Sequence, residues 1–330
     1  MPTSPRLATA ADVHDEAARL GFLACGVAHL GPSQHGAELD AWLAKGYAGT
    51  MRYLHRQARR RKHPAVIVPK ARVAVVVLEN YWTEGRRGRE VDGPSVQIAS
   101  YARGEDYHRA LMRRLAQLAG FLMHRGAKVA HPWADSGPVP ERELAQRAGL
   151  GWIGKNTMLI RPGAGSFCFI GTVFTDLELV PDAPFEPDHC GTCTACLDAC
   201  PTSAIVAPRL LDATRCISYL TIESGQPIPA DIAPKLSGWA FGCDICNDVC
   251  PWNERFATAT PRPEYQPRSE PDRHDPDYFT GMTEEEFDRR FGDTPLARPG
   301  LARMRRNWRN AWLGIDGKAA RRQDGRTAGE

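Results

Sequence analysis

The sequence predicts an α/β (α+β) N-terminal domain, a small cysteine-rich domain after it and a short helical C-terminal region. Three observations lead to this prediction. The β-branched run at 71–78 indicates a buried strand, amphipathic helical periodicity recurs around it, and eight of the ten cysteines lie between positions 190 and 250. The expected domain limits are 1–180, 181–256 and 257–315, followed by a disordered tail at 316–330.

The remaining elements follow from periodicity and turn signals. Apolar residues recur every three to four positions in 106–124, which predicts a helix there. Pro140 suits the first turn of a helix at 141–148, and helices are also expected at 13–20, 283–291 and 301–313. A short strand is expected at 128–131. The segments 157–160 and 167–174, separated by Arg-Pro-Gly-Ala-Gly, are predicted to pair as a β-hairpin. The stretch 257–277 is rich in Pro, Arg and acidic residues, so we expect an irregular connector.

The cysteine-rich domain carries two runs with ligand spacing. The first reads CxxCxxCxxxCP, the bacterial ferredoxin spacing, in which three cysteines hold one cubane cluster and the fourth crosses to the other. The second run has only three cysteines, and the isolated Cys216 completes the count. The expected ligand sets are Cys190, Cys193, Cys196 and Cys250 for one [4Fe–4S] cluster, and Cys200, Cys216, Cys243 and Cys246 for the other.

Zinc is the alternative metal for sets of four thiolates. A zinc site typically uses two separated CxxC pairs, and the first cysteine run does not have that form. The spacing therefore favours two [4Fe–4S] clusters and a protein that moves electrons. Cys25 and Cys168 lie in apolar surroundings and are interpreted as core thiols rather than ligands.

Composition and cysteine usage predict a cytoplasmic protein. The sequence is 42% hydrophobic and 25% charged, which is ordinary for a soluble globular chain. Clustered cysteines indicate metal in a reducing compartment rather than disulfides. Residues 1–20 contain no apolar signal segment, and no run approaches the roughly 18 apolar residues of a membrane span. We expect no membrane partner and a monomer.

Positive charge gathers in two places, although the net charge is only +3. The segment 51–62 holds six cations and no acidic residue: Arg52, Arg56, Arg59, Arg60, Arg61 and Lys62. The C-terminal stretch is also rich in arginine. Clustered arginine suits a phosphate backbone, and a solvated helix face is the alternative reading.

The glycines at 149–154 match the GxGxxG pattern of a nucleotide site, and Lys155 follows them. That reading needs a strand before the glycines and a helix after them. Here a predicted helix precedes them and an extended segment follows, so nucleotide binding is not expected. The glycines instead indicate close approach of the backbone to a neighbour.

An ordered set of motifs across most of the chain resembles the epoxyqueuosine reductases, which complete queuosine synthesis at the wobble base of certain tRNAs. The two cysteine runs belong to this set. The others are Met51-Arg-Tyr53 with Arg61 and Pro64, Tyr101 to His108, Asp135 to Ala145, Ala148 to Asn156, Gly165-Ser166, Arg215 to Glu223, and Trp308-Arg-Asn310.

The resemblance implies a cobalamin-binding α/β domain related to reductive dehalogenases. In such an enzyme the clusters deliver low-potential electrons to the cobalt, and the epoxide oxygen leaves as water. Asp135 matches the family's proton donor, although alone it would be interpreted as a turn residue. The implied cobalamin contacts are Arg61, Tyr101, Asp135, Lys155, Asn156, Thr157, Met158, Ser166, Ser218, Gly242, Cys243 and Asp244.

The same resemblance implies a tRNA substrate carrying epoxyqueuosine, presented as an unstacked anticodon loop, and an unidentified low-potential electron donor. The implied tRNA contacts are Arg303, Arg305, Arg306, Arg309 and Asn310. Family members commonly continue through a longer helical-repeat region, so part of the tRNA surface is expected to differ here.

Two other functions remain open at this point. One is a cobalamin-dependent, reductive dehalogenase-like reductase of a small molecule. The other is a dicluster electron-transfer protein without a substrate of its own, for which the long domain before Cys190 would have little use.

Overall fold

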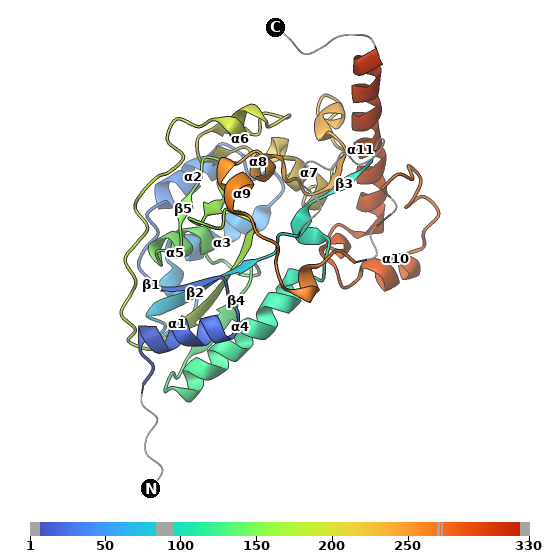
Figure 1. Ribbon diagram of the computed structural model, residues 1–330. Helices are drawn as coiled ribbons and strands as arrows, with labels where there is room; N and C mark the ends of the chain where they lie inside the picture. Colours follow the sequence, from blue (N-terminus) through green and yellow to red (C-terminus); the bar gives the residue numbers. More distant parts are fainter. Residues whose placement is uncertain (1–6, 84–94, 269–270, 272, 324–330) are drawn as a thin grey trace.

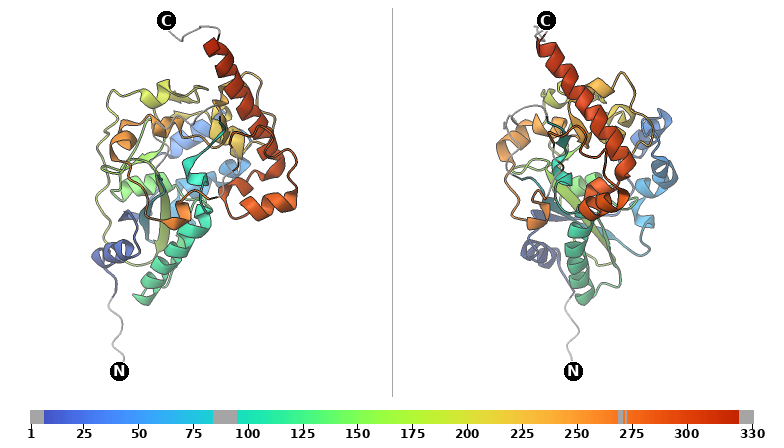
Figure 2. Two further views of the ribbon diagram at one scale, coloured as in Figure 1. Left: turned by 45° about the vertical axis from the view of Figure 1, so that its right-hand side comes forward. Right: turned by 90° about the vertical axis from the view of Figure 1, so that its right-hand side faces the viewer.

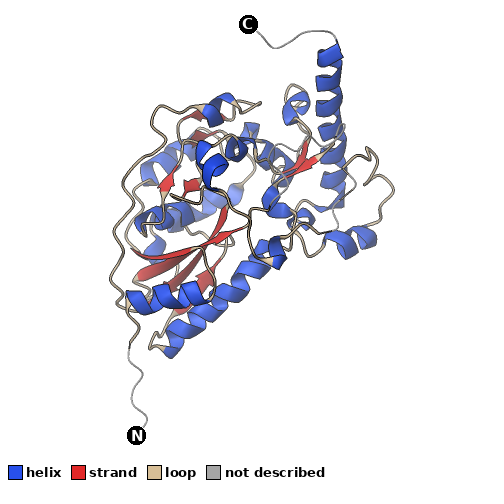
Figure 3. Ribbon diagram, in the orientation of Figure 1, coloured by secondary structure: helices blue, strands red, loops and turns tan. Residues whose placement is uncertain are grey.

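The structure is a computed structural model that describes residues 7–83, 95–268, 271 and 273–323, with side chains to 315 (Figure 1). A four-stranded antiparallel sheet forms its N-terminal half. The strand order is β1 (Ala24–His29), β2 (Val73–Asn80), β7 (Cys168–Thr175) and β4 (Ala130–Trp133). Figure 3 shows these strands gathered in one sheet with helices on both sides.

Strand β2 is buried on both faces, which explains its continuous apolar sequence. Val73, Val75 and Val77 pack toward α1 (Ala10–Arg19) and α4 (Tyr107–His124). The alternate residues of β2, with Val76 at their centre, pack toward α5 (Glu141–Arg147) on the opposite face. Because side chains alternate along a strand, each face contributes to a different core. The predicted strand and all three helices are confirmed.

The predicted hairpin is wrong. Strand β6 (Leu159–Ile160) pairs with β5 (Trp152–Ile153), whereas β7 lies between β2 and β4. One isolated bridge, Arg161 to Gly165, joins the two segments. Strand β7 has apolar side chains on both faces. The centre of the sheet buries more of this apolar surface than pairing with the two-residue strand β6 would.

The glycine segment has the expected order of elements, since α5 precedes it and β5 follows it. A Cβ on Gly151 would lie 2.2 Å from the carbonyl oxygen of Ile160, and Gly149 has a φ of +73°. Only glycine fits where a neighbouring backbone comes this close. The predicted close approach is therefore confirmed, between the paired strands β5 and β6.

The second half of the chain is built from short elements around the cysteines and from C-terminal helices. The remaining helices are α2 (Gly36–Ala44), α3 (Arg52–Lys62), α6 (Ala195–Asp198), α7 (Ile217–Ile222), α8 (Ile245–Asp248), α9 (Pro251–Phe256), α10 (Glu284–Phe291) and α11 (Gly300–Gln323). The remaining strands are β3 (Gln97–Ile98), β8 (Ile205–Ala207), β9 (Leu210–Leu211) and β10 (Trp239–Phe241). Short 3-10 turns occupy Pro64–Val66, Ser100–Ala102, Ala213–Arg215, Ala233–Leu236, Pro263–Tyr265 and Pro295–Ala297.

Helix α11 is longer than the predicted 301–313 and crosses the face of the molecule in Figure 2. Residues 316–323 of the predicted tail are thus helical, while 324–330 lie outside the described residues. Its buried Met304 and Trp308 share a core with α10 and with the two-stranded parallel sheet of β3 and β10. This core fixes α11 against the cysteine region. The domain limits given above remain predictions.

Within the described part of the chain, no helix combines the length and apolar character needed to cross a membrane.

Candidate active site and cluster-binding region

A cavity of about 890 Å³ lies where the N-terminal half, the cysteine region and the segment after α10 meet. Helix α3, the loop after β4, the start of α4 and helix α7 form its walls. Four of the sequence-predicted contacts line it: Arg61, Tyr101, Asp135 and Ser218. Cys216 also lines the cavity, so one predicted cluster ligand reaches the same space.

Asp135 is fixed at the cavity wall by contacts from several elements. Its carboxylate accepts a 2.5 Å hydrogen bond from the hydroxyl of Tyr107, which stacks on Phe169. The Nε2 atom of His108 lies 3.9 Å from the same oxygen. The Asp135 backbone has a φ of +52°, a left-handed conformation that Asp tolerates better than most residues. Its side chain is 63% exposed, so it faces the space in which a substrate would bind.

Glu141 stands behind Asp135 and accepts a 2.8 Å hydrogen bond from the Asp135 backbone N–H. Burial, followed by the negative charge of Asp135, raises the pKa of Glu141 to about 8. Burial lowers the pKa of the adjacent Arg142, whose guanidinium donates to the Thr157 carbonyl oxygen at 2.5 Å. Glu141 therefore holds a proton near neutrality beside the predicted donor.

Arg61 lines the cavity and has one hydrogen-bond donor without a partner among the described residues. Its two Nη atoms donate to the carbonyl oxygens of Gly137 and Val139, at 3.3 and 3.4 Å. Its buried Nε has no hydrogen-bond partner among the described residues. Buried polar groups are normally satisfied, so this nitrogen fits a polar group bound in the cavity.

The other predicted cofactor contacts lie next to the cysteine loops instead of on the cavity wall. Lys155 donates to the carbonyl oxygens of Gly191 and Cys193, at 2.6 and 2.9 Å. Asn156 donates to the carbonyl oxygen of Cys246 at 3.2 Å. These contacts give the segment after β5 a direct role in shaping the cysteine loops.

The rest of the predicted cofactor contacts are similarly engaged. Ser166 donates to the Asn247 side chain at 3.0 Å, in a buried network that includes Asn253. Gly242, with a φ of +62°, donates to the Thr221 hydroxyl at 3.0 Å, and Asp244 accepts from the Ser100 N–H at 2.7 Å. Met158 donates from its backbone to the Asn156 side chain at 3.2 Å.

The first predicted cysteine set gathers in space. Burial raises the pKa of Cys196, and the nearby thiols of Cys190, Cys250 and Cys193 raise it further. Trp152 donates from its indole nitrogen to the sulfur of Cys190 at 3.4 Å. Cys193 is the exposed member of the set.

The second set gathers beside it. Burial raises the pKa of Cys246 well above its ordinary value, and the thiols of Cys243, Cys216, Cys200 and Cys196 add to this effect. Because Cys196 belongs to the first set, the two sets are neighbours. Burial raises the pKa of Cys216, against backbone hydrogen bonds from Tyr219 and Ser218 that lower it.

Two of the predicted ligands occupy helix starts. Cys216 precedes α7 and Cys250 precedes α9, and backbone N–H groups of the first helical turn lower the pKa of each thiol against the raising effect of burial. Among the described residues, no group of three or more His, Cys, Asp or Glu side chains is arranged to hold a single metal ion. Each thiolate of a cubane binds a different iron atom, so cluster ligands need not converge on one point.

Comparisons with known proteins agree with this geometry. Residues 189–253 match the family described as "4Fe-4S double cluster binding domain", and residues 61–136 match "Epoxyqueuosine reductase QueG, DUF1730". An epoxyqueuosine reductase of Pseudomonas aeruginosa is 40% identical over 93% of this chain and 85% of its own length. The chain belongs to the epoxyqueuosine reductase family.

Solved structures of the family have the same fold. An epoxyqueuosine reductase crystallised with an epoxyqueuosine-modified tRNA-Tyr stem loop matches 94% of this chain and 82% of its own, at 28% identity and a TM-score of 0.84. A Bacillus subtilis epoxyqueuosine reductase matches 95% of this chain and 83% of its own, at 27% identity and a TM-score of 0.82. In that structure the catalytic aspartate loop is swung out of the active site. Like its relatives, this chain is an oxidoreductase with a domain for two [4Fe–4S] clusters.

The two cysteines outside the sets behave as core thiols. Cys25 and Cys168 pack against the apolar cores on the two faces of the sheet. Burial raises the pKa of each to about 12, which keeps both thiols protonated and unreactive.

The arginines predicted to touch tRNA have another task in this member of the family. Arg303, Arg305 and Arg306 donate to main-chain carbonyl oxygens, among them those of Ile222, Phe279 and Leu220, at 3.0, 2.9 and 2.8 Å. Asn310 donates to the carbonyl oxygen of Arg306. Arg309 is exposed. A tRNA role for these residues remains a prediction.

Sequence reasoning missed several residues that line or support the cavity. Tyr107 and Glu141 both lie within motifs that carry the family resemblance, but no spacing assigns them a role. Glu223 and Arg298 form a 2.7 Å ion pair on the cavity wall. They are 75 positions apart, so no local pattern could have paired them.

Proposed function

We propose that this protein reduces epoxyqueuosine to queuosine at the wobble position of tRNA, with electrons passing through two [4Fe–4S] clusters to cobalamin. The observation that carries the proposal is the shared cavity, in which a predicted cluster ligand, Cys216, and a predicted proton donor, Asp135, line one space. The family relative crystallised with an epoxyqueuosine-modified stem loop supports the substrate.

The positions of the thiols support a direction for the electrons. Cys193 of the first set is exposed, so electrons from a low-potential donor protein enter there. The second set adjoins the first and reaches the cavity through Cys216. The proposed path is therefore donor, first cluster, second cluster and cavity.

The cavity fits a large cofactor with an apolar body and a polar periphery. Tyr101 and Phe241 supply aromatic surface, while Arg61 and Ser218 supply polar groups. The unsatisfied Nε of Arg61 is consistent with a polar partner in this space. When bound, cobalamin would supply a strongly reducing cobalt centre, which protein side chains cannot provide.

Asp135 is the proposed proton donor to the epoxide oxygen. An alkoxide leaves poorly unless it is protonated, so the reaction calls for an acid at a fixed position. The hydroxyl of Tyr107 fixes the Asp135 carboxyl, and the protonated Glu141 reduces the negative charge around it. The Bacillus subtilis relative, which has an aspartate on its catalytic loop, supports the assignment.

The test is an anaerobic assay of the reconstituted enzyme with cobalamin, a strong reductant and epoxyqueuosine-containing tRNA, followed by nucleoside mass spectrometry. Queuosine should form, and omission of cobalamin should abolish it. Asp135→Asn should lower kcat by about 100-fold or more, because general acid catalysis contributes on this scale. Cluster content should not change.

Failure to convert the tRNA, with both clusters intact and cobalamin bound, would contradict the proposal. Such a protein would be better described as a small-molecule reductase. An absence of any effect of cobalamin would instead indicate a dicluster electron-transfer protein.

A further inference from the structure

Helix α3 presents a cationic surface that the proposed chemistry does not use. Residues recur on one side of a helix every three to four positions, and Arg52, His55, Arg56, Arg59 and Arg60 fall on one exposed side of α3. We call these five residues the α3 stripe. Helix α3 contains no acidic residue.

The α3 stripe borders the active-site cavity. Tyr53, Gln57 and Arg61, at intervals of four, line the cavity on the adjacent side of the same helix. At about 100° per residue, these three positions continue directly from the arc of the stripe. A molecule that enters the cavity along α3 therefore passes over the stripe.

The charges of the stripe are unpaired. Across the part of the chain that the structure describes, the guanidinium groups of Arg52, Arg56, Arg59 and Arg60 form no hydrogen bond or ion pair. Lys62 lies outside the stripe and differs, because it binds Asp40 at 2.7 Å. An uncompensated row of arginines is disfavoured by mutual repulsion unless an anion binds it.

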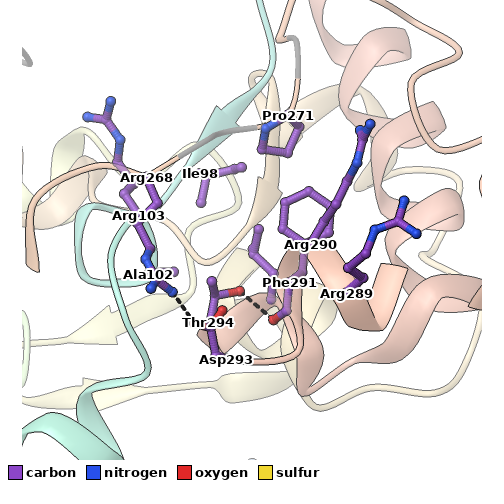
Figure 4. Close-up of a pocket in the computed structure, with 11 residues that line it drawn as sticks. Ile98, Ala102, Arg103, Arg268, Pro271, Arg289, Arg290, Phe291, Asp293 and Thr294 are labelled. Atoms are coloured by element: carbon purple, nitrogen blue, oxygen red, sulfur yellow. Dashed lines mark hydrogen bonds and ion pairs between the residues drawn. The ribbon is translucent and has the colours of Figure 1, made fainter. Parts of the chain in front are cut away.

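In two other arginine groups, several of the guanidinium groups already have partners. Four arginines surround a cavity of about 400 Å³ beside α10 (Figure 4). There Arg268 pairs with Asp293, and Arg290 pairs with Glu286 at 3.1 Å. Arg303, Arg305 and Arg306 of α11 bind main-chain carbonyl oxygens, as described above. Of these three arginine groups, the α3 stripe therefore has the most unpaired positive charge next to the active-site cavity.

We propose that the α3 stripe binds the phosphate backbone of the tRNA arm whose wobble nucleotide enters the cavity. This inference rests on the proposed function and adds the surface that holds the substrate. Arginine matches phosphate geometry with paired N–H donors. The stripe would supply affinity and orientation without reading the base sequence.

The test compares two triple variants of the holoenzyme with equal loss of charge. Arg52→Gln, Arg56→Gln and Arg60→Gln together remove three of the four arginine charges of the stripe and leave Arg61 in place. The control combines Lys70→Gln, Lys128→Gln and Lys235→Gln, exposed cations that do not line the cavity. Each triple variant removes three positive charges, and matching thermal midpoints would show that both fold.

The stripe variant should bind an epoxyqueuosine stem loop about 10- to 100-fold more weakly than wild type at low salt. The slope of log affinity against log salt should become shallower by about two, since each phosphate contact contributes about 0.7 in single-stranded RNA. KM should rise while kcat stays unchanged. The control variant should match wild type, and Arg→Lys at the same three stripe positions should retain most of the binding.

Unchanged affinity of the stripe variant, with wild type active, would overturn this inference and leave the proposed function standing. Equal weakening by both triple variants would also overturn it, because net charge alone would then explain the effect. A wild-type enzyme that neither binds nor converts the stem loop would overturn both proposals.

Discussion

At the residue scale, the position of Asp135 depends on partners from two different helices. Tyr107 comes from α4 and Glu141 from the start of α5, and each forms one hydrogen bond to Asp135. The left-handed backbone of Asp135 adds a conformational cost that these bonds offset. We therefore expect Tyr107 and Glu141 to affect catalysis through the orientation and protonation of Asp135.

Tyr107→Phe removes the hydroxyl but keeps the ring stacked on Phe169. We expect kcat to fall by up to about 10-fold, because a hydrogen bond between neutral groups contributes about 0.5–1.5 kcal/mol. Single-turnover conversion, with tRNA affinity as the control, measures this. A change in KM alone would contradict a positioning role for Tyr107.

Glu141→Gln should change the pH dependence of stability. The pKa of Glu141 is about 8 in the folded protein, well above the ordinary value near 4.3 in an unfolded chain. Between these values the folded state holds a proton that the unfolded state has lost. The contribution of Glu141 to folding stability is therefore present at low pH and is lost as pH rises through about 8.

The thermal midpoint of Glu141→Gln minus that of wild type should thus become more positive from pH 5 to pH 8. Above pH 8 this difference should stay constant. A constant difference across this range would contradict the raised pKa.

At the element scale, α11 supports the cavity wall through hydrogen bonds from its arginine side chains to main-chain carbonyl oxygens. Arg306 donates to the carbonyl oxygens of Leu220 and Ser224, at 2.8 and 2.9 Å, and Arg303 donates to that of Ile222. Leu220 and Ile222 belong to α7, the helix that begins after Cys216. Arg303 and Arg306 therefore stabilise an element that connects a predicted cluster ligand to the cavity.

Arg306→Met should destabilise the protein by about 2–3 kcal/mol, because charged donors to buried carbonyl groups are lost. Arg309→Met is the matched control on the same helix, and its effect should stay within about 0.5 kcal/mol because Arg309 is exposed. Thermal unfolding of the two variants provides the comparison. Equal destabilisation would show that the carbonyl contacts of Arg306 contribute little.

At the scale of the whole molecule, the clusters and the fold are coupled. Apart from the exposed Cys193, the cysteines of the two sets are buried or half-buried. Burial raises the pKa of several of these thiols, so metal must displace protons as it binds. The free energy of cluster binding is thereby added to the stability of the region around α7.

Cys216→Ser should lower the iron content from about eight to about four atoms per chain, because one of two four-iron clusters loses a ligand. Hydrogen exchange in α7 should rise, while β2 should keep its protection. Cys25→Ser, which changes a core thiol, should retain all the iron. Iron analysis and exchange mass spectrometry check both variants. Full iron retention in Cys216→Ser would remove Cys216 from the ligand set.

The sequence alone was sufficient for features that depend on local pattern. The β-branched run predicted β2, helical periodicity predicted α4 and α5, and the cysteine spacing predicted a two-cluster domain. Each signal lies within a short segment, because burial on two faces and metal ligation both constrain neighbouring residues directly. The family resemblance rests on the same ordered motifs.

Only the tertiary structure decided which residues act together. It placed β7 in the central sheet instead of a hairpin, and it set Tyr107 and Glu141 against Asp135. It also distinguished two arginine-rich segments of similar composition. Arg303, Arg305 and Arg306 of α11 donate to carbonyl oxygens, whereas the arginines of the α3 stripe have no partner in the described chain. Most of these pairings join positions far apart in sequence, and the free energy that selects them arises from packing of the whole chain.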